Sequence, residues 1–218
     1  MELNQLKRGV DILVWLGELV IPLYKKIDSS KFKQNRDFRW WLDRKNFLTK
    51  QECEDFIKRI DNDCVKKVKD VYYGKDSNPK YKEDPAVCNL NVAVYDDLEM
   101  LSKYWMAFKI ANQVHYKYDI GGIHRNEYTG HRYDVGDWYT PHADFHPSND
   151  FTIVKMTGIV FLNNDYEGGE FKLFDDTIIE PEIGRLVIFP SFAGHEVKPV
   201  TKGVRYTSVC WVAGDTFV

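Results

Sequence analysis

The fold is decided by residues 150–176, DFTIVKMTGIVFLNNDYEGGEFKLFDD, and residues 181–212, PEIGRLVIFPSFAGHEVKPVTKGVRYTSVCWV. In both stretches, short runs rich in Val, Ile, Phe and Tyr alternate with clusters of Gly, Asn, Asp and Pro, which is typical of strands joined by tight turns. Corners are expected at residues 163–165, 168–169, 175–176, 181–184 and 202–203. The pattern predicts an antiparallel β-barrel or jelly roll from residue 118 onward.

Two helices are expected before the barrel, so the predicted fold class is α+β and mainly β. Thr49 and Glu52 form a capping box, which predicts a helix over residues 50–61 with Phe56 and Ile60 on its buried face. A second helix is predicted over residues 96–116, where apolar residues recur at steps of three and four: Leu98, Leu101, Trp105, Phe108, Ile110 and Val114. Both helices are expected to pack against one sheet of the jelly roll.

Composition narrows the class of protein. The chain has 218 residues, of which 44% are hydrophobic and 15% aromatic, and this is enough for one domain with a proper core. Its formal net charge is −3 without a block of like charge, so neither a nucleic-acid backbone nor an anionic membrane is an expected partner. Four widely spaced cysteines without a CxxC pair favour reduced thiols and a cytoplasmic location: Cys53, Cys64, Cys88 and Cys210.

The first part of the chain is expected to be an extension of the core. Residues 10–24, VDILVWLGELVIPLY, are apolar, but Asp11, Gly17, Glu18 and Pro22 interrupt them, so we expect an amphipathic segment and not a membrane span. Residues 71–89 are rich in Gly, Pro, Lys and Asp and should form an exposed loop beside a substrate groove. The predicted organisation is an extension packed on the core (1–44) and one domain (45–218) with a helical part (45–117) and a β-barrel core (118–218).

Three residues are candidate metal ligands. His142 and Asp144 follow Pro141, which places them near the beginning or edge of a strand. Residues two apart on a strand share one face, so both side chains should point at one spot inside the barrel. His195 follows an apolar strand and a Gly-containing loop and is the candidate third ligand. Two histidines and a carboxylate that leave the opposite positions of an octahedral ion open are typical of non-heme Fe(II) oxygenases.

A candidate anion site lies ten residues further on. The alternation in GVRYTSVCWV puts Arg205, Thr207, Val209 and Trp211 on one face. A buried guanidinium without a partner is very costly, so Arg205 should meet either an internal acid or an anionic ligand. The planar fork of arginine binds a carboxylate through two parallel hydrogen bonds, and the Thr207 hydroxyl would add a third. The pair therefore suits the distal end of a dicarboxylate.

Four stretches resemble the prolyl 4-hydroxylase-like group of the 2-oxoglutarate/Fe(II)-dependent dioxygenases: NFLTKQECEDFI (46–57), EYTGHRYDVGDWYTPHADF (127–145), GIVFLNNDYEGGEF (158–171) and GRLVIFPSFAGHEVKPVTKGVRYTSVCW (184–211). The resemblance implies a double-stranded β-helix for the jelly roll and a catalytic domain over residues 45–218. It implies hydroxylation of an unactivated C–H bond, in a prolyl or other side chain of a peptide or protein, while 2-oxoglutarate and O2 become succinate and CO2.

The resemblance also assigns roles to single residues. It implies that Fe(II) is held by His142, Asp144 and His195, with no further catalytic residue. It implies that Arg205 binds the C5 carboxylate of 2-oxoglutarate, with Thr207 assisting and Tyr133 beside the cosubstrate. Ascorbate is a further candidate cofactor.

The chain departs from parts of the family pattern. Phe161 stands where some members have a tyrosine that contacts the C5 carboxylate, so Thr207 or Tyr133 is expected to replace that hydrogen bond. Arg205 stands where collagen-type prolyl hydroxylases have a lysine, which shifts the resemblance toward oxygen-sensing and bacterial members. The related nucleic-acid demethylases have a second arginine where this chain has Trp211.

Two other interpretations stay open. A cupin-type Zn or Mn hydrolase or isomerase would use the same three ligands without a dicarboxylate at Arg205. A non-catalytic binding barrel would recognise its partner through the basic, aromatic loop at residues 72–81. Neighbouring residues are given structural roles: rim solvation for Asp134 and Asp137, solvent or ligand-supporting contact for His146, and core or rim packing ahead of groove lining for Trp138 and Tyr139.

Overall fold

The computed structural model describes residues 39–63, 67–68, 87–145, 152–174 and 177–215, with only the backbone at 67–68. Residues 39–218 form one compact unit. Its helices are α2 (Lys50–Asp63) and α3 (Leu98–Ala111), the latter continued by the π-helical turn η3 (Asn112–Tyr116). The strands are β1 (Leu42–Arg44), β2 (Lys67–Val68), β3 (Cys88–Tyr95), β4 (Gly122–Tyr133), β5 (Trp138–His142), β6 (Thr152–Phe161), β7 (Glu167–Gly168), β8 (Phe171–Leu173), β9 (Thr177–Ile179), β10 (Leu186–Pro190), β11 (His195–Val197), β12 (Val200–Lys202) and β13 (Arg205–Asp215).

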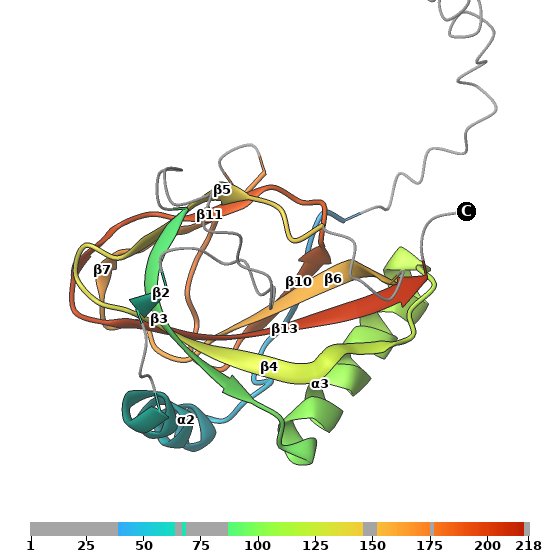
Figure 1. Ribbon diagram of the computed structural model, residues 1–218, viewed down its shortest axis with the longest axis horizontal. Helices are drawn as coiled ribbons and strands as arrows, with labels where there is room; N and C mark the ends of the chain where they lie inside the picture. Colours follow the sequence, from blue (N-terminus) through green and yellow to red (C-terminus); the bar gives the residue numbers. More distant parts are fainter. Residues whose placement is uncertain (1–38, 64–66, 69–86, 146–151, 175–176, 216–218) are drawn as a thin grey trace, which may run out of the picture. The chain divides into compact units, whose positions relative to one another are not determined.

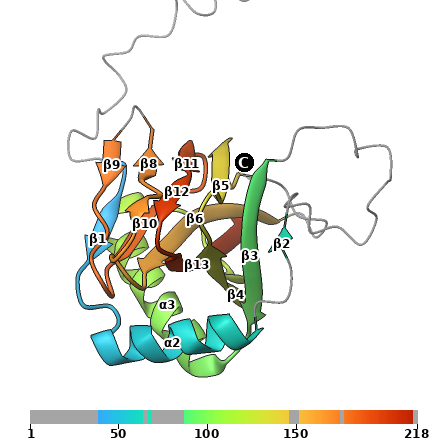
Figure 2. The same ribbon diagram turned by 90° about the vertical axis from the view of Figure 1, so that its left-hand side faces the viewer.

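The strands form a curled antiparallel sheet. Their order is β1-β10-β6-β13-β4-β3-β5-β11-β8-β9, with β2 beside β3 and a separate pair β12-β7. Every described pair of adjacent strands is antiparallel. The sheet curls so that β5 and β11 lie opposite β4, β13 and β6, and the two views show the helices below the latter layer (Figures 1 and 2). The prediction of a mainly β, antiparallel, jelly-roll-like chain is confirmed.

The sheet begins earlier in the chain than residue 118. β1, which lies in the segment 1–44 that was expected to be an extension packed on the core, pairs with β10. β3 pairs with β4 through residues 91–95 and with β5 through residues 88–89, although residues 45–117 were expected to be helical apart from a loop. β3 forms there because its apolar side chains, Cys88, Leu90, Ala93 and Tyr95, are buried in the core. Residues 1–38 and the remainder of the predicted loop, 71–86, lie outside the described residues.

Helix α2 begins with the predicted capping box. The backbone N–H of Thr49 donates to Glu52 Oε2 at 2.7 Å, and the N–H of Glu52 donates to Thr49 Oγ1 at 3.2 Å. Both bonds satisfy N–H groups that a helix start leaves unpaired. Phe56 is buried as predicted, and its ring packs on Tyr95 of β3 and Tyr128 of β4. The helix runs two residues further than predicted.

Helix α3 buries only some of the apolar positions in its sequence, namely Leu101 and Phe108. Leu98 and Ile110 are exposed, whereas the buried face is formed by Leu101, Tyr104, Ala107, Phe108 and Ala111. Tyr104 belongs to this face because its hydroxyl donates to Ser208 Oγ of β13 at 2.8 Å, which satisfies a polar group inside the core. The helix thus contacts the outer surface of the layer that contains β13. Within the described residues, no helix has both the length and the apolar character needed to span a membrane.

Most of the predicted corners coincide with glycines in the left-handed region. Gly168, Gly169, Gly184 and Gly203 have φ angles of +71°, +63°, +74° and +76°. Such angles are open to glycine and costly for other residues. Residues 175–176, another predicted corner, lie outside the described part of the chain.

Gly184→Ala is expected to lower the free energy of unfolding by about 3 kcal/mol. The loss has two causes: an alanine is strained in the left-handed region, and its added methyl group overpacks the site. The Gly184 carbonyl accepts hydrogen bonds from the N–H groups of Phe47 and Leu48, and an added Cβ would lie 1.9 Å from the Leu48 carbonyl oxygen. Chemical denaturation measures the effect. Gly136→Ala is the matched control, because its φ is +87° but no atom lies within 4 Å of an added Cβ. Equal losses in the two variants would refute the role of the close approach.

Candidate functional site

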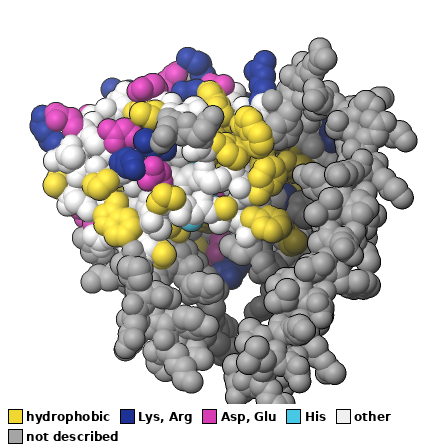
Figure 3. Space-filling view, turned by 90° about the horizontal axis from the view of Figure 1, so that it is seen from above, with side chains coloured by type: hydrophobic (Ala, Val, Ile, Leu, Met, Phe, Trp, Pro, Cys, Tyr) yellow, Lys and Arg dark blue, Asp and Glu magenta, His cyan; other side chains and the backbone are white. Residues whose placement is uncertain are grey.

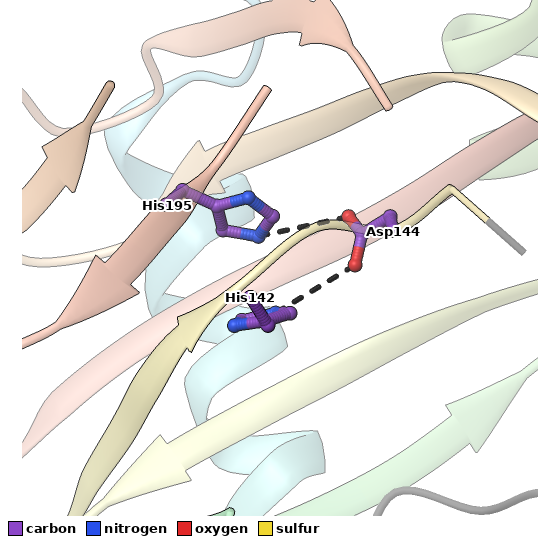
Figure 4. A group of neighbouring side chains, drawn as sticks. All are labelled: His142, Asp144 and His195. Atoms are coloured by element: carbon purple, nitrogen blue, oxygen red, sulfur yellow. Dashed lines mark ion pairs between the residues drawn. The ribbon is translucent and has the colours of Figure 1, made fainter. Parts of the chain in front are cut away.

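The three candidate metal ligands converge on one point. His142 ends β5, Asp144 follows two residues later, and His195 begins β11, where it pairs directly with His142. The Asp144 carboxylate faces both imidazoles from one side (Figure 4), with Oδ1 3.6 Å from His142 Nε2 and Oδ2 3.7 Å from His195 Nε2. All three ligand atoms lie within 4.8 Å of one another. The spacing of two residues and the strand pairing together produce this cluster.

Backbone carbonyls fix both imidazoles. His142 Nδ1 lies 2.8 Å from the carbonyl oxygen of Thr140, and His195 Nδ1 lies 2.9 Å from that of Ala193. A carbonyl oxygen only accepts, so Nδ1 carries the proton in each ring and Nε2 keeps its lone pair. The two lone pairs are therefore available next to Asp144. Carbonyl contacts of this kind are typical of metal-binding histidines.

The protonation states suit a cation. Burial lowers the pKa of His142 to about 4, with the neighbouring His195 acting in the same direction, so its imidazole is neutral at pH 7. Burial by itself would raise the pKa of Asp144, but the two histidines and hydrogen bonds from Thr157 and Trp211 hold that pKa below its usual value. The result is a carboxylate beside imidazole nitrogens, a donor set for a divalent transition metal.

Three neighbours of the cluster were not recognised from the sequence. Thr157 Oγ1 and Trp211 Nε1 donate to Asp144 Oδ2 at 2.6 and 3.0 Å. The ring of Tyr139 stacks on His142 with centroids 3.7 Å apart and planes inclined by 13°. Only two sequence features pointed to these contacts: a threonine lies inside the apolar run of β6, and Trp211 lies on the same face of its strand as Arg205.

Asp137 corrects another expectation. It was expected to solvate the rim, but it is fully buried. Its carboxylate accepts hydrogen bonds from the Asn89 side chain at 2.7 Å and from the backbone N–H of Asp134 at 3.0 Å. Asp137 therefore supports the turn between β4 and β5. Asp134 is half-buried and accepts from Arg132 and Asn91.

Thr157→Val is expected to weaken binding of a divalent metal by about 10- to 100-fold, the usual cost of losing a partner that orients a ligand. Valine keeps the shape of threonine but cannot donate to Asp144. Calorimetric titration with Mn(II) measures the change. Thr201→Val, at an exposed position on β12, is the control and should bind normally. Unchanged affinity in Thr157→Val would mean that the hydrogen bond does not orient the carboxylate.

The cluster opens into a cavity of about 1260 Å³ that also contains the predicted anion site. Its lining includes the three candidate ligands together with Arg205, Thr207 and Tyr133. Val209 and Trp211 line the same cavity, as the alternation in β13 predicts. Residues 72–81 and His146 lie outside the described residues.

Arg205 is a buried cation whose hydrogen bonds are incomplete. It is 1% exposed, and Nη1 donates to Thr207 Oγ1 at 3.4 Å. Nε and Nη2 have no hydrogen-bond partner, and no carboxylate forms an ion pair with Arg205 in the part of the chain that the structure describes. Its guanidinium carbon lies 4.9 Å from the ring centroid of Tyr133 and 5.8 Å from that of Phe161. Because unpaired donors on a buried cation are costly, the site fits an anionic ligand better than an internal ion pair.

Comparison with known proteins shows matches in sequence. Residues 128–213 match the model of the 2OG-Fe(II) oxygenase superfamily. Relatives include the PKHD-type hydroxylase YbiX of Shigella sonnei (strain Ss046) and of Escherichia coli (strain K12 / DH10B), each 34% identical over 37% of this chain and 40% of the relative. The chain thus spans about 40% of the length of the curated relatives it matches.

Solved structures share the fold over a larger part of the chain. A viral collagen prolyl hydroxylase from Paramecium bursaria Chlorella virus-1, in complex with 2OG, has a TM-score of 0.61 at 18% identity and covers 82% of this chain and 98% of its own. A prolyl-4-hydroxylase of Pseudomonas putida has a TM-score of 0.59 at 17% identity, covering 82% and 94%. A prolyl hydroxylase of Trichoplax adhaerens, in complex with a peptide of hypoxia inducible factor, has a TM-score of 0.59 at 18% identity, covering 81% and 84%.

The segment matched by the family model contains the whole cluster and Arg205. The curled antiparallel sheet of this chain agrees with the fold of the solved prolyl hydroxylases. Residues 128–213 are thus similar in sequence to the 2OG-Fe(II) oxygenase superfamily, and the chain shares its fold with solved prolyl hydroxylases.

Proposed function

We propose that this protein is an Fe(II)- and 2-oxoglutarate-dependent dioxygenase that hydroxylates a prolyl or other side chain of a peptide or protein. One observation carries the proposal: a two-histidine, one-carboxylate cluster and a buried arginine with unpaired donors face the same cavity. His142, Asp144 and His195 would hold Fe(II). Arg205 would bind the distal carboxylate of 2-oxoglutarate, with Thr207 and Tyr133 beside it.

The residues of this chain would bind and orient the reactants. When bound, Fe(II) and 2-oxoglutarate supply the oxidising chemistry, in which the keto acid and O2 end as succinate and CO2. Tyr139 restricts the His142 ring by stacking on it, and the apolar side chains of Ile159, Val197 and Val209 limit water in the cavity. We further infer a double-stranded β-helix with α2 and α3 packed on one sheet, supported by the contacts of Phe56 and Tyr104.

A polymeric substrate is supported by the surface near the site. In the view from above (Figure 3), hydrophobic side chains gather on one side of the face, and others lie beside the charged side chains on the opposite side. The exposed rings of Trp40, Phe174 and Phe192 form one cluster, with the Trp40 centroid 4.5 and 6.4 Å from the other two. Phe192 precedes His195 by three residues, so the cluster lies on the same segment as a candidate metal ligand. Such a surface suits a peptide whose side chain enters the cavity.

We also propose a cytoplasmic location and ascorbate as an accessory reductant. The location is supported by the state of the described cysteines, because Cys53, Cys88 and Cys210 are free and buried. Ascorbate follows from the proposed reaction class alone.

The test is a turnover assay with two readouts. Anaerobically purified protein is mixed with Fe(II), labelled 2-oxoglutarate and O2, with and without Pro-rich peptides. Succinate formation and a mass gain of one oxygen atom on a prolyl residue are expected. His142→Ala should lose both signals. Failure of the unaltered protein to form succinate with any peptide or protein substrate would favour the binding-barrel interpretation.

A further inference from the structure

Four polar side chains form a square on the inner face of the sheet. Tyr133 and His131 of β4 pair directly with Arg205 and Thr207 of β13. All four line the cavity. Directly opposed residues on antiparallel strands have Cβ atoms roughly 4.5–5.5 Å apart, so the four side chains can contact one ligand group. Sequence reasoning assigned three of these residues to the cosubstrate and gave no role to His131.

Thr207 has two different neighbours across the sheet. On one side it pairs with His131, and on the other it pairs with Phe161 of β6. Phe161 offers no hydrogen-bond donor. His131 does, so the polar side of the anion pocket lies on β4.

His131 has one ring nitrogen that is not used by the protein. Nε2 lies 2.9 Å from Thr129 Oγ1, and the ring forms no other hydrogen bond within the described part of the chain. Thr129 has a single hydroxyl proton and two acceptors within reach, Nε2 of His131 and the Val209 carbonyl oxygen at 3.3 Å. If Thr129 donates to the Val209 carbonyl, the ring proton lies on Nε2, and if Thr129 donates to Nε2, the ring proton lies on Nδ1. An anion in the cavity favours the second arrangement, because only a proton on Nδ1 can then be donated to it.

His131 is also neutral. Burial lowers its pKa to about 3, and the positive charge of Arg205 acts in the same direction. A neutral imidazole adds a donor beside the guanidinium without adding a second positive charge. It therefore contributes a hydrogen bond to an anion at little electrostatic cost.

We propose that His131 determines specificity for a keto diacid: its Nδ1–H donates to the same distal carboxylate that Arg205 binds. This inference rests on the proposed function and extends it to a residue on the neighbouring strand. The alternative is a structural role, in which His131 only positions Thr129. The two roles differ for ligands that lack the distal carboxylate.

The experiment compares two keto acids under conditions without turnover. Calorimetry measures binding of 2-oxoglutarate and of 2-oxobutyrate, which has no distal carboxylate, to the Mn(II)-loaded full chain. His131→Leu removes the donor, and His131→Gln keeps an N–H donor in a side chain of similar size. We expect His131→Leu to weaken 2-oxoglutarate binding about tenfold or more, the usual effect of losing a hydrogen bond to a charged group. Binding of 2-oxobutyrate should change less than about twofold.

Rescue variants separate a direct contact from a folding effect. His131→Gln should recover part of the affinity for 2-oxoglutarate. Phe161→Tyr in the His131→Leu background should also recover part of it, because a hydroxyl then flanks Thr207 from the other side. Thermal unfolding of each variant shows that the fold is retained.

The outcomes are distinguishable. Normal 2-oxoglutarate binding by His131→Leu, or an equal loss for both keto acids, would overturn the inference alone. If the unaltered Mn(II)-loaded protein did not bind 2-oxoglutarate, the proposed function would fail and this inference with it.

Discussion

Asp144→Ala is expected to abolish succinate formation and to weaken Mn(II) or Fe(II) binding by more than about 100-fold, because loss of a mere supporting partner already costs 10- to 100-fold. Within the described residues, the change removes the one carboxylate that lies beside both His142 and His195, namely that of Asp144 itself. It also leaves the Thr157 hydroxyl and the Trp211 indole N–H without the acceptor that they share. Metal titration by calorimetry and a succinate assay measure the two effects.

Asp134→Ala is the matched control for this prediction. Asp134 is also a hydrogen-bonded carboxylate close to the sheet, but it accepts from Arg132 and Asn91 and does not line the cavity. Its replacement should leave metal affinity within about twofold, because distant sites are usually independent. Retained metal binding in Asp144→Ala would contradict the assignment of this residue as a ligand. A comparable loss in both variants would indicate damage to the fold.

Arg205→Ala is expected to raise the KM for 2-oxoglutarate by about 30-fold or more, since truncating one partner of a buried charge pair costs about 2–5 kcal/mol. Metal affinity should be unchanged, because Arg205 contacts Thr207, Tyr133 and Phe161 and none of the three ligands. Initial rates against 2-oxoglutarate concentration measure the KM. Arg205→Lys keeps the charge but loses the planar fork, so its KM should lie between those of the other two proteins.

The same position separates the competing interpretations. A cupin-type hydrolase or isomerase would keep its activity in Arg205→Ala, because its reaction needs no dicarboxylate. Arg205→Met replaces an unpaired buried cation with an apolar side chain of similar length. Without 2-oxoglutarate this variant should be at least as stable as the unaltered protein, as is common when a buried charge is replaced by a packed hydrophobic group. Thermal unfolding without and with 2-oxoglutarate would measure this.

Local patterns predicted the features that depend on a single segment. The capping box at Thr49 and the glycine corners follow from the chemistry of a few adjacent residues, and they are present. The face shared by His142 and Asp144 follows from the two-residue period of a strand. His195 could be added because a polar residue after an apolar strand was the best candidate for a third ligand.

Features that depend on the pairing of distant strands could not be predicted. The donors to Asp144 come from β6 and β13, and their distance depends on register. The register between β4 and β13 likewise places His131 beside Thr207. β3 was missed because CNLNVAVY mixes asparagines with apolar residues and directly follows a stretch without periodicity. The buried face of α3 was predicted only in part, with Leu101 and Phe108, because apolar residues surround that helix and only its packing selects among them.

The double pairing of β3 has a mechanical consequence. One end of this strand is hydrogen-bonded to β5, which carries His142, and the other end to β4, which neighbours the strand of Arg205. The β3 backbone thus connects the layer of β5 to the layer of β4 along one side of the cavity. Moving the two layers apart on that side would break the hydrogen bonds that β3 makes with β4 or β5. The main chain therefore sets the distance between the metal-binding and anion-binding ends of the cavity. Substitutions of side chains inside the cavity should change its chemistry more readily than its width.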